Sequence, residues 1–213
     1  MDKCTTDGLL AQITLLIFLV GGCVQKSKAE PLWDGSSNMN PKNIGFWALI
    51  KEDFDTHHND ILAQGFFALF VHRLGNWRMS ISFKLLRFPF SILYCILSKM
   101  TQVFCGIKLD YTVHVGRRVK IEHFGGMILG ARSIGDDVVI RQNTTFGIRD
   151  TSDLSAKPII ESNVNIGAGV VIIGDITIGR GSKIAPNSVV VSDVPAFSTV
   201  YVKATVVTKS TAE

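Results

Sequence analysis

The chain contains few cysteines, and these form no recognisable pattern. Cys4, Cys23, Cys95 and Cys105 form no CxxC pair, and no cysteine follows residue 105. A disulfide framework or a zinc site built from cysteines is therefore not expected. The simplest interpretation is a reduced protein of the cytoplasm.

A strong excess of charge of one sign is also lacking. The net charge is +4 at pH 7, and the basic residues are scattered rather than gathered in a stripe. This argues against nucleic acid as a partner, because such proteins carry a concentrated basic surface. Hydrophobic residues make up 46% of the 213 residues, which is enough for a sizeable core.

The first 38 residues contain a short apolar run but no positively charged segment before it. The run, residues 13–24, is too short to span a bilayer comfortably, and its end at Cys23 resembles a lipoprotein cleavage site. A secretory signal requires a positively charged segment before its apolar run, and the residues before this run carry no net positive charge. Residues 1–38 are therefore predicted to be a tail, with a start at Met39 or a targeting segment as alternatives.

Residues 39–106 are predicted to form a helical domain. Apolar residues recur at helical spacing through 44–58, 60–77 and 81–104, with Asp60 as the expected N-cap of the second helix and a bend or break expected at Pro89. The third stretch is very apolar. Core packing is the first interpretation, and weak association with a membrane surface is the alternative.

From residue 109 the period becomes six. Aliphatic or aromatic residues recur in two runs: Leu109, Val115, Ile121, Ile128, Ile134, Ile140 and Phe146, then Ile160, Ile166, Ile172, Ile178, Ile184 and Val190. A hexapeptide repeat is typical of a parallel β-helix, in which three short strands make one triangular coil and the periodic residue points inward. Residues 107–195 are predicted to form this domain, and residues 196–213 a C-terminal tail.

The repeat has two irregular steps. Seven residues separate Ile121 from Ile128, with two adjacent glycines taking up the extra residue, and fourteen separate Phe146 from Ile160. The polar segment 148–158 in the longer step is predicted to leave the prism as a loop. Loops on rigid scaffolds often carry binding residues.

Histidine is scarce in the repeat domain, which contains only His114 and His123. His123 stands beside the first irregular step, and the two glycines after Phe124 leave room for a substrate near the backbone. An imidazole is the usual general base for taking a proton from an alcohol. His123 is therefore the candidate catalytic residue.

Residues 45–195 resemble the serine acetyltransferase group of hexapeptide-repeat acyltransferases and the related acetyltransferases of surface-polysaccharide clusters, such as those for colanic acid. The resemblance is carried by "GFFALFVHRLGNW", by "IEHFGG" and by "NIGAGVVIIGDI". It implies a left-handed parallel β-helix preceded by helices, a homotrimer, and acetyl-CoA as co-substrate with no permanently bound cofactor. No metal site is expected.

The resemblance also implies roles for individual residues. His123 matches the general base and Glu122 an acceptor-binding acid. The usual base-orienting carboxylate lies fifteen residues earlier, which here is Lys108, so Asp110 is the nearest candidate. Gly147, Gly167, Ala168 and Lys183 are assigned to CoA binding. The family's Arg-His pair before the loop proline is replaced by Ala156 and Lys157, which leaves Arg149 and Lys157 as candidate acceptor-binding cations.

The sequence thus predicts an acetyl-CoA-dependent O-acetyltransferase acting on a small hydroxyl acceptor. A saccharide unit of a surface polysaccharide is slightly preferred over L-serine, because the loop departs from the serine-binding pattern. The alternative is a non-catalytic β-helix scaffold or binding subunit. A zinc enzyme like the trimeric carbonic anhydrases is disfavoured, because such a site needs three histidines and the repeat domain has two.

Overall fold

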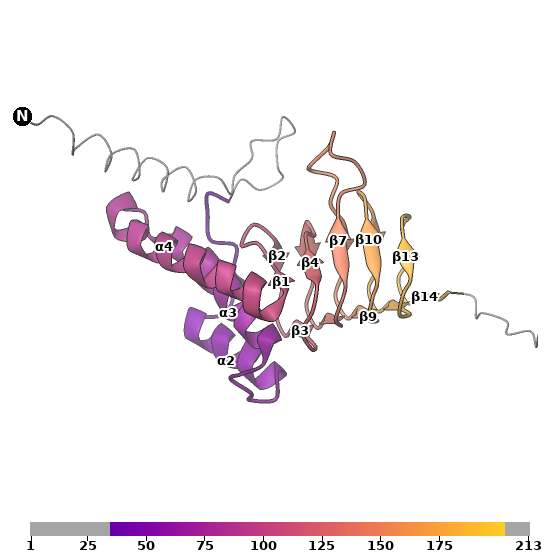
Figure 1. The fold of residues 1–213 in the computed structure, drawn as a ribbon, viewed down its shortest axis with the longest axis horizontal. Helices are drawn as coiled ribbons and strands as arrows, with labels where there is room; N and C mark the ends of the chain where they lie inside the picture. The colour runs from indigo at the N-terminus through magenta and orange to yellow at the C-terminus, as the bar shows by residue number, and fades with distance from the viewer. Residues whose placement is uncertain (1–34, 203–213) are drawn as a thin grey trace, which may run out of the picture.

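A computed structural model describes residues 35–202, as a group of helices followed by a β-prism (Figure 1). The helices lie at the N-terminal end of the prism. They are α2 (Phe46–Thr56), α3 (Gln64–Trp77), the short η1 (Arg78–Ser80), α4 (Lys84–Met100) and η2 (Thr101–Cys105). The apolar run at 13–24 and the end of the C-terminal tail lie outside the described residues.

The prism has three parallel sheets, and the chain visits them in turn, which confirms the predicted left-handed parallel β-helix. The first, sheet A, contains β1 (Ile107–Lys108), β4 (Met127–Leu129), β7 (Thr145–Gly147), β10 (Val171–Ile173) and β13 (Val189–Val190). Sheet B contains β2 (His114–Val115), β5 (Ser133–Ile134), β8 (Ile159–Ile160) and β11 (Thr177–Ile178). Sheet C contains β3 (Lys120–Ile121), β6 (Val139–Ile140), β9 (Asn165–Ile166), β12 (Lys183–Ile184) and β14 (Thr199–Val200).

The periodic residues form inward ladders in the register that the repeat predicts, with one correction. Phe146 pairs with Ile172, and Ile172 with Val190. The residue of β4 that pairs with Phe146 is Leu129, which is fully buried, whereas Ile128 points outward and is 50% exposed. The prediction that Ile128 lies inside was therefore wrong, because the connection before β4 contains two extra residues rather than one.

A second inward row accompanies the first and was not predicted. The residue two positions before a periodic residue is in most coils also buried, because side chains of the same parity in a short strand point to the same face. Arg132, two positions before Ile134, is an exception and is half-buried. This row contains Val113, Val119, Val138, Thr144, Val164, Val170, Ile176, Ser182 and Ser188.

The N-cap predicted at Asp60 and the break predicted at Pro89 were both wrong. The Asp60 carboxylate accepts a hydrogen bond from the Leu62 amide at 2.8 Å, so it stabilises the turn before α3, whose N-cap is Ala63. Pro89 does not break α4, which runs unbroken from Lys84 to Met100. The helical part ends at Gly106, whose φ of 64° closes η2 before β1 begins.

Candidate active site

His123 lies on the connection that joins sheet C to sheet A after the first coil. Its φ is 66°, and Gly125 two residues later has a φ of 131°. The Gly125 amide donates to the Cys105 carbonyl at 3.3 Å, which fastens the connection to the end of η2. The His123 side chain is exposed, and no hydrogen bond to its imidazole is found within residues 35–202. The imidazole is thus accessible to a ligand from outside the prism.

Glu122, beside His123, is held by two cations. Its carboxylate lies 3.0 Å from Lys120 Nζ and 3.1 Å from Arg141 Nε. The hydrogen bond from Lys120, followed by the charges of Lys120 and Arg141, lowers the pKa of Glu122, while partial burial opposes this. Glu122 is therefore an ionised carboxylate next to the candidate base. Arg141, which sequence reasoning did not identify, also donates to Asn165 Oδ1 at 2.6 Å.

The helices hold the strand that leads into this corner. His57 Nε2 accepts a hydrogen bond from the Ile121 amide at 3.2 Å, and its Nδ1 lies 2.7 Å from the Asp53 carbonyl. Burial lowers the pKa of His57, so its imidazole is neutral and can act as acceptor on one side and donor on the other. At Gly65, any Cβ would overlap the Ile121 carbonyl. The start of α3 therefore rests directly on the strand before His123.

A buried ion pair anchors α3 to the first coil, and sequence reasoning missed it. Arg73 Nε donates to Asp53 Oδ2 at 2.9 Å, and both side chains are fully buried. The same guanidinium donates to the carbonyls of Val115 at 2.8 Å and Gly116 at 2.6 Å. The available signal was an arginine in the mostly apolar stretch "GFFALFVHRLGNW", because a charged residue on a packed helix needs a partner.

The predicted site residues divide between two edges of sheet A. His123 and Glu122 lie at the edge next to sheet C, while Asp110 and Gly147 lie at the edge next to sheet B. No hydrogen bond or ion pair joins Asp110 to His123 in the described part of the chain. One protomer therefore does not bring the proposed orienting carboxylate to the proposed base, and the role of Asp110 stays a prediction.

Two of the CoA-binding candidates, Gly147 and Gly167, are glycines for different structural reasons. A Cβ at Gly167 would lie 2.5 Å from the Pro186 nitrogen, so this glycine is required by the next coil of the same chain. A Cβ at Gly147 would meet nothing within 4 Å. The lack of a side chain at Gly147 therefore leaves open surface and is not needed to avoid a clash within the chain. Gly147 is thus the position where a ligand or neighbouring chain can approach the backbone.

Ala168 and Lys183 lie apart from Gly147. The register of sheet C places Ile166 two coils below Ile121, so Ala168 lies on the His123 edge, about 10 Å down the prism at the ordinary strand spacing. Lys183 is exposed on the outer face of sheet C, in register with Asn165. The structure therefore does not gather Lys183 with the other candidates.

The loop between β7 and β8 protrudes from the prism as predicted (Figure 1). Arg132 Nη2 donates to the Ser155 carbonyl at 3.0 Å and lies 3.1 Å from Asp175 Oδ1, so it ties the loop to the prism. Arg149 is exposed and Lys157 half-buried at the two ends of the loop. Both cations remain available beside the Gly147 edge.

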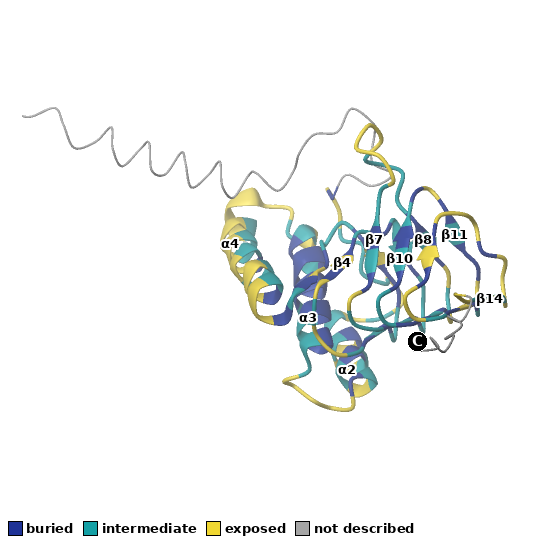
Figure 2. Cartoon of the chain, turned by 45° about the vertical axis from the view of Figure 1, so that its right-hand side comes forward, coloured by how far each residue is buried: buried dark blue, intermediate teal, exposed yellow. Residues whose placement is uncertain are grey.

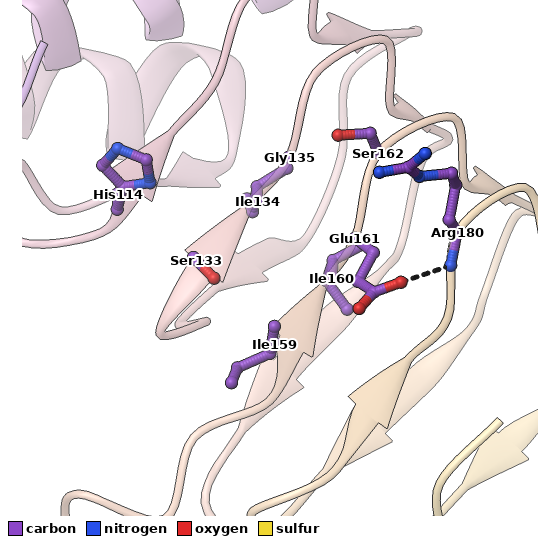
Figure 3. Close-up of a pocket in the computed structure, with 9 residues that line it drawn as sticks. All are labelled: His114, Ser133, Ile134, Gly135, Ile159, Ile160, Glu161, Ser162 and Arg180. Atoms are coloured by element: carbon purple, nitrogen blue, oxygen red, sulfur yellow. Dashed lines mark hydrogen bonds between the residues drawn. The ribbon is translucent and has the colours of Figure 1, made fainter. Parts of the chain in front are cut away.

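A shallow hollow of about 240 Å³ lies on sheet B rather than at His123 (Figure 3). It is lined by His114, Ser133, Glu161, Ser162 and Arg180, among others, and the Arg180 amide donates to Glu161 Oε2 at 2.7 Å. Burial, then the nearby Arg73 cation, lowers the pKa of His114. We place the candidate active site at His123 nonetheless, because His123 stands exposed beside the ionised Glu122 carboxylate at the irregular step of the repeat. In residues 35–202, no cluster of three histidine, cysteine, aspartate or glutamate residues has the arrangement of a metal site.

Comparison with solved structures shows which known proteins share this architecture. Serine acetyltransferase isoform 3 from Entamoeba histolytica, solved with cysteine, has a TM-score of 0.62 at 19% identity and covers 78% of this chain and 62% of its own. Serine acetyltransferase from Brucella abortus strain S19, solved with coenzyme A, has a TM-score of 0.61 at 22% identity and covers 80% and 78%. These likenesses establish the shared fold.

The sequence comparisons extend this to the family. Residues 157–192 match the family described as bacterial transferase hexapeptide (six repeats). The serine acetyltransferase of Bacillus subtilis (strain 168) is 34% identical over 160 residues, which are 73% of this chain and 74% of that protein. That of Staphylococcus xylosus is 36% identical over 125 residues, 58% of each. The chain is therefore an acyltransferase that belongs to the serine acetyltransferase family of hexapeptide-repeat enzymes.

Proposed function

We propose that the protein transfers the acetyl group of acetyl-CoA to the hydroxyl of L-serine, giving O-acetylserine and CoA. The observation that carries this is the 34% identity to a serine acetyltransferase across 74% of that relative's length. The relatives reported above give no support to the preference for a saccharide acceptor. The Brucella abortus relative was solved with coenzyme A, which supports acetyl-CoA as the donor.

In the proposed reaction His123 is the general base. Its imidazole takes the proton of the serine hydroxyl as the oxygen attacks the thioester carbon, forming a tetrahedral oxyanion. When the intermediate collapses, the carbon–sulfur bond breaks and the imidazolium returns its proton to the CoA thiolate. The neighbouring Glu122 carboxylate, held ionised by Lys120 and Arg141, can accept a hydrogen bond from the amino group of serine.

We propose that the site is completed by a second copy in a homotrimer. The outer face of sheet A carries Ile128, 50% exposed, Val189, 66% exposed, and the half-buried Val171. The other two outer faces carry more polar residues, so this apolar stripe is the best candidate for an interface between copies. His123 and Gly147 lie at opposite edges of this face. When copies pack through it around a threefold axis, the His123 edge of one protomer can lie next to the Gly147 edge of its neighbour.

Arg149 and Lys157 are the proposed partners of the serine carboxylate. Both lie on the loop that follows Gly147, and the tie between Arg132 and Ser155 restricts how far this loop can move. Two separate cations replace the bidentate pattern, so we expect weaker serine binding rather than loss of the reaction.

The proposal is tested by following CoA release from acetyl-CoA with L-serine. His123→Ala should reduce kcat by about 10²–10⁴-fold, the usual contribution of a general base, with an unchanged thermal melt. His114→Ala is the matched control, because it removes the other histidine of the repeat domain and should leave kcat within a fewfold of wild type.

Two results would contradict the proposal in different ways. Full activity of His123→Ala would show that His123 is not the base and that another group takes the proton of the hydroxyl. Turnover on a nucleotide sugar but not on serine would retain acetyl transfer and overturn the acceptor.

A further inference from the structure

The helix formed by α4 and η2 is amphipathic, but its polar face packs on the protein and its apolar face points outward, which is the opposite of a helix that packs on a core. One row of polar residues faces the protein, at intervals of four and three: Arg87, Ser91, Tyr94, Ser98 and Thr101. Tyr94 is the only buried residue of α4. This face is fixed, because Arg78 Nη1 donates to Ser91 Oγ at 2.8 Å and the Arg78 guanidinium lies 4.7 Å from the Tyr94 ring centre.

The opposite face is apolar and exposed along the whole helix. Figure 2 shows exposed residues along α4, while α3 beside it is mostly buried. Leu85 is 73% exposed, Ile96 54% and Val103 75%, and these three lie on one line of the helix. Others on the same face are Leu86, Phe88, Ile92, Leu93, Met100 and Phe104. We call this set of residues the α4 outer face. A contiguous apolar surface of this kind marks an interaction site.

The charges around the α4 outer face have one sign. No aspartate or glutamate occurs between Asp60 and Asp110, so the whole segment from α3 to β1 lacks acidic side chains. Lys84 and Lys99 are exposed at the two ends of α4. An apolar face bordered by lysines is complementary to a surface that is apolar inside and anionic outside, which describes the headgroup boundary of an anionic membrane.

The helix is long enough to cross a membrane, but its packing favours lying flat. The stretch Lys84–Cys105 has 22 residues and a mean hydropathy that meet the length and composition of a spanning helix. A spanning orientation would place the Arg78 side chain and the contacts with α3 in hydrocarbon, which is costly. A helix about 33 Å long that keeps one face on the protein can instead bury the other in the interface.

From these observations we propose that the α4 outer face docks the enzyme on a membrane surface containing anionic phospholipids, with the helix lying in the plane of the interface. This does not depend on the acceptor proposed above. It deepens the sequence-based alternative of a weak membrane association by naming the helix face, its orientation and the lipid charge.

The test is sedimentation of the full chain with vesicles of phosphatidylglycerol and phosphatidylcholine in equal parts, against vesicles of phosphatidylcholine alone. Wild type should sediment with the anionic vesicles. Leu85→Glu/Val103→Glu should lower the partition coefficient at least about tenfold, since two apolar side chains are lost from the bound surface and two like charges are added. Lys84→Gln/Lys99→Gln should reduce the preference for anionic over neutral vesicles.

The matched control is Ile61→Glu/Leu62→Glu. These residues are 72% and 81% exposed in the turn before α3, so the variant adds the same charge to equally exposed apolar positions away from the α4 outer face. It should sediment like wild type. Serine acetylation by each variant, measured without vesicles, should match wild type and shows that the fold is retained.

Three outcomes would overturn the proposal. Wild type that stays in solution would show that the face does not bind lipid. Equal sedimentation of wild type and Leu85→Glu/Val103→Glu would assign binding to another segment, such as the apolar run at 13–24. A smaller particle for this variant in sedimentation velocity, with no lipid binding by wild type, would assign the face to a second copy of the chain.

Discussion

Replacing Arg73 by methionine should destabilise the protein strongly, because Arg73 joins the helices to the first coil. Its guanidinium is fully buried and donates to both Asp53 carboxylate oxygens and to the carbonyls of Val115 and Gly116. Burial raises the pKa of Asp53 in spite of the attraction of Arg73, so desolvation of the carboxylate outweighs the ion pair. Buried ion pairs generally add little net stability, whereas removal of one partner leaves an uncompensated buried charge and is costly.

The size of the effect follows from what each substitution leaves buried. Arg73→Met leaves an unpaired carboxylate, and Asp53→Leu an unpaired guanidinium, so each should lower the free energy of unfolding by about 3–5 kcal/mol. The double variant leaves no buried charge. Only the two carbonyls lose their donor, at about 1–3 kcal/mol each. The double variant should therefore be more stable than the two single losses added together predict, by about 4 kcal/mol at the middle of these ranges.

The assay is urea unfolding of wild type, both single variants and the double variant, followed by helix content. If the free energy of unfolding falls with urea concentration at a similar slope in every variant, each exposes a similar amount of surface on unfolding. If the loss in the double variant equals the sum of the single losses, the two side chains are not coupled, and the assigned anchor is wrong.

Two further predictions concern the site and its support. Gly147→Val should fold normally, because its side chain points into open space, but it should raise the KM for acetyl-CoA about tenfold. An unchanged KM would remove Gly147 from the CoA site. Gly167→Ala should instead lower the melting temperature, because its Cβ would lie 2.5 Å from the Pro186 nitrogen. Burial lowers the pKa of His72 to about 3 and also lowers that of His57, so both are neutral when folded. As the pH falls below about 6.5 the unfolded chain takes up protons that the folded chain does not, so urea unfolding should show stability falling by up to about 1.4 kcal/mol per pH unit for each histidine. A flat stability profile between neutral and mildly acidic pH would contradict this.

Much of the prism could be predicted from the sequence because the repeat is local. Each six-residue unit supplies its own inward residue, and the next coil repeats the register, so thirteen periodic positions specify one architecture. The error at Ile128 arose where the repeat was interrupted. Periodicity locates inward residues only within an unbroken run, and the length of the connection at Phe124–Gly126 is set by its fit against η2.

The candidate site was partly predictable. His123 could be identified from an irregular step, a double glycine and the chemistry of imidazole. The Arg73–Asp53 anchor and the support from His57 could not, because they join residues far apart in the sequence through contacts between a helix and the first coil. The same applies to Gly147 and Gly167, which look alike in the sequence and differ only in what lies beside them.

The sequence by itself determined the coiled prism, the position of its loop and the histidine at its irregular step, because these follow from a short period and from side-chain chemistry. Only the tertiary structure decided which face of α4 points outward and which edges of sheet A carry the site residues. Both depend on how separate elements pack, and helical spacing is the same whether the apolar face meets a core or remains exposed.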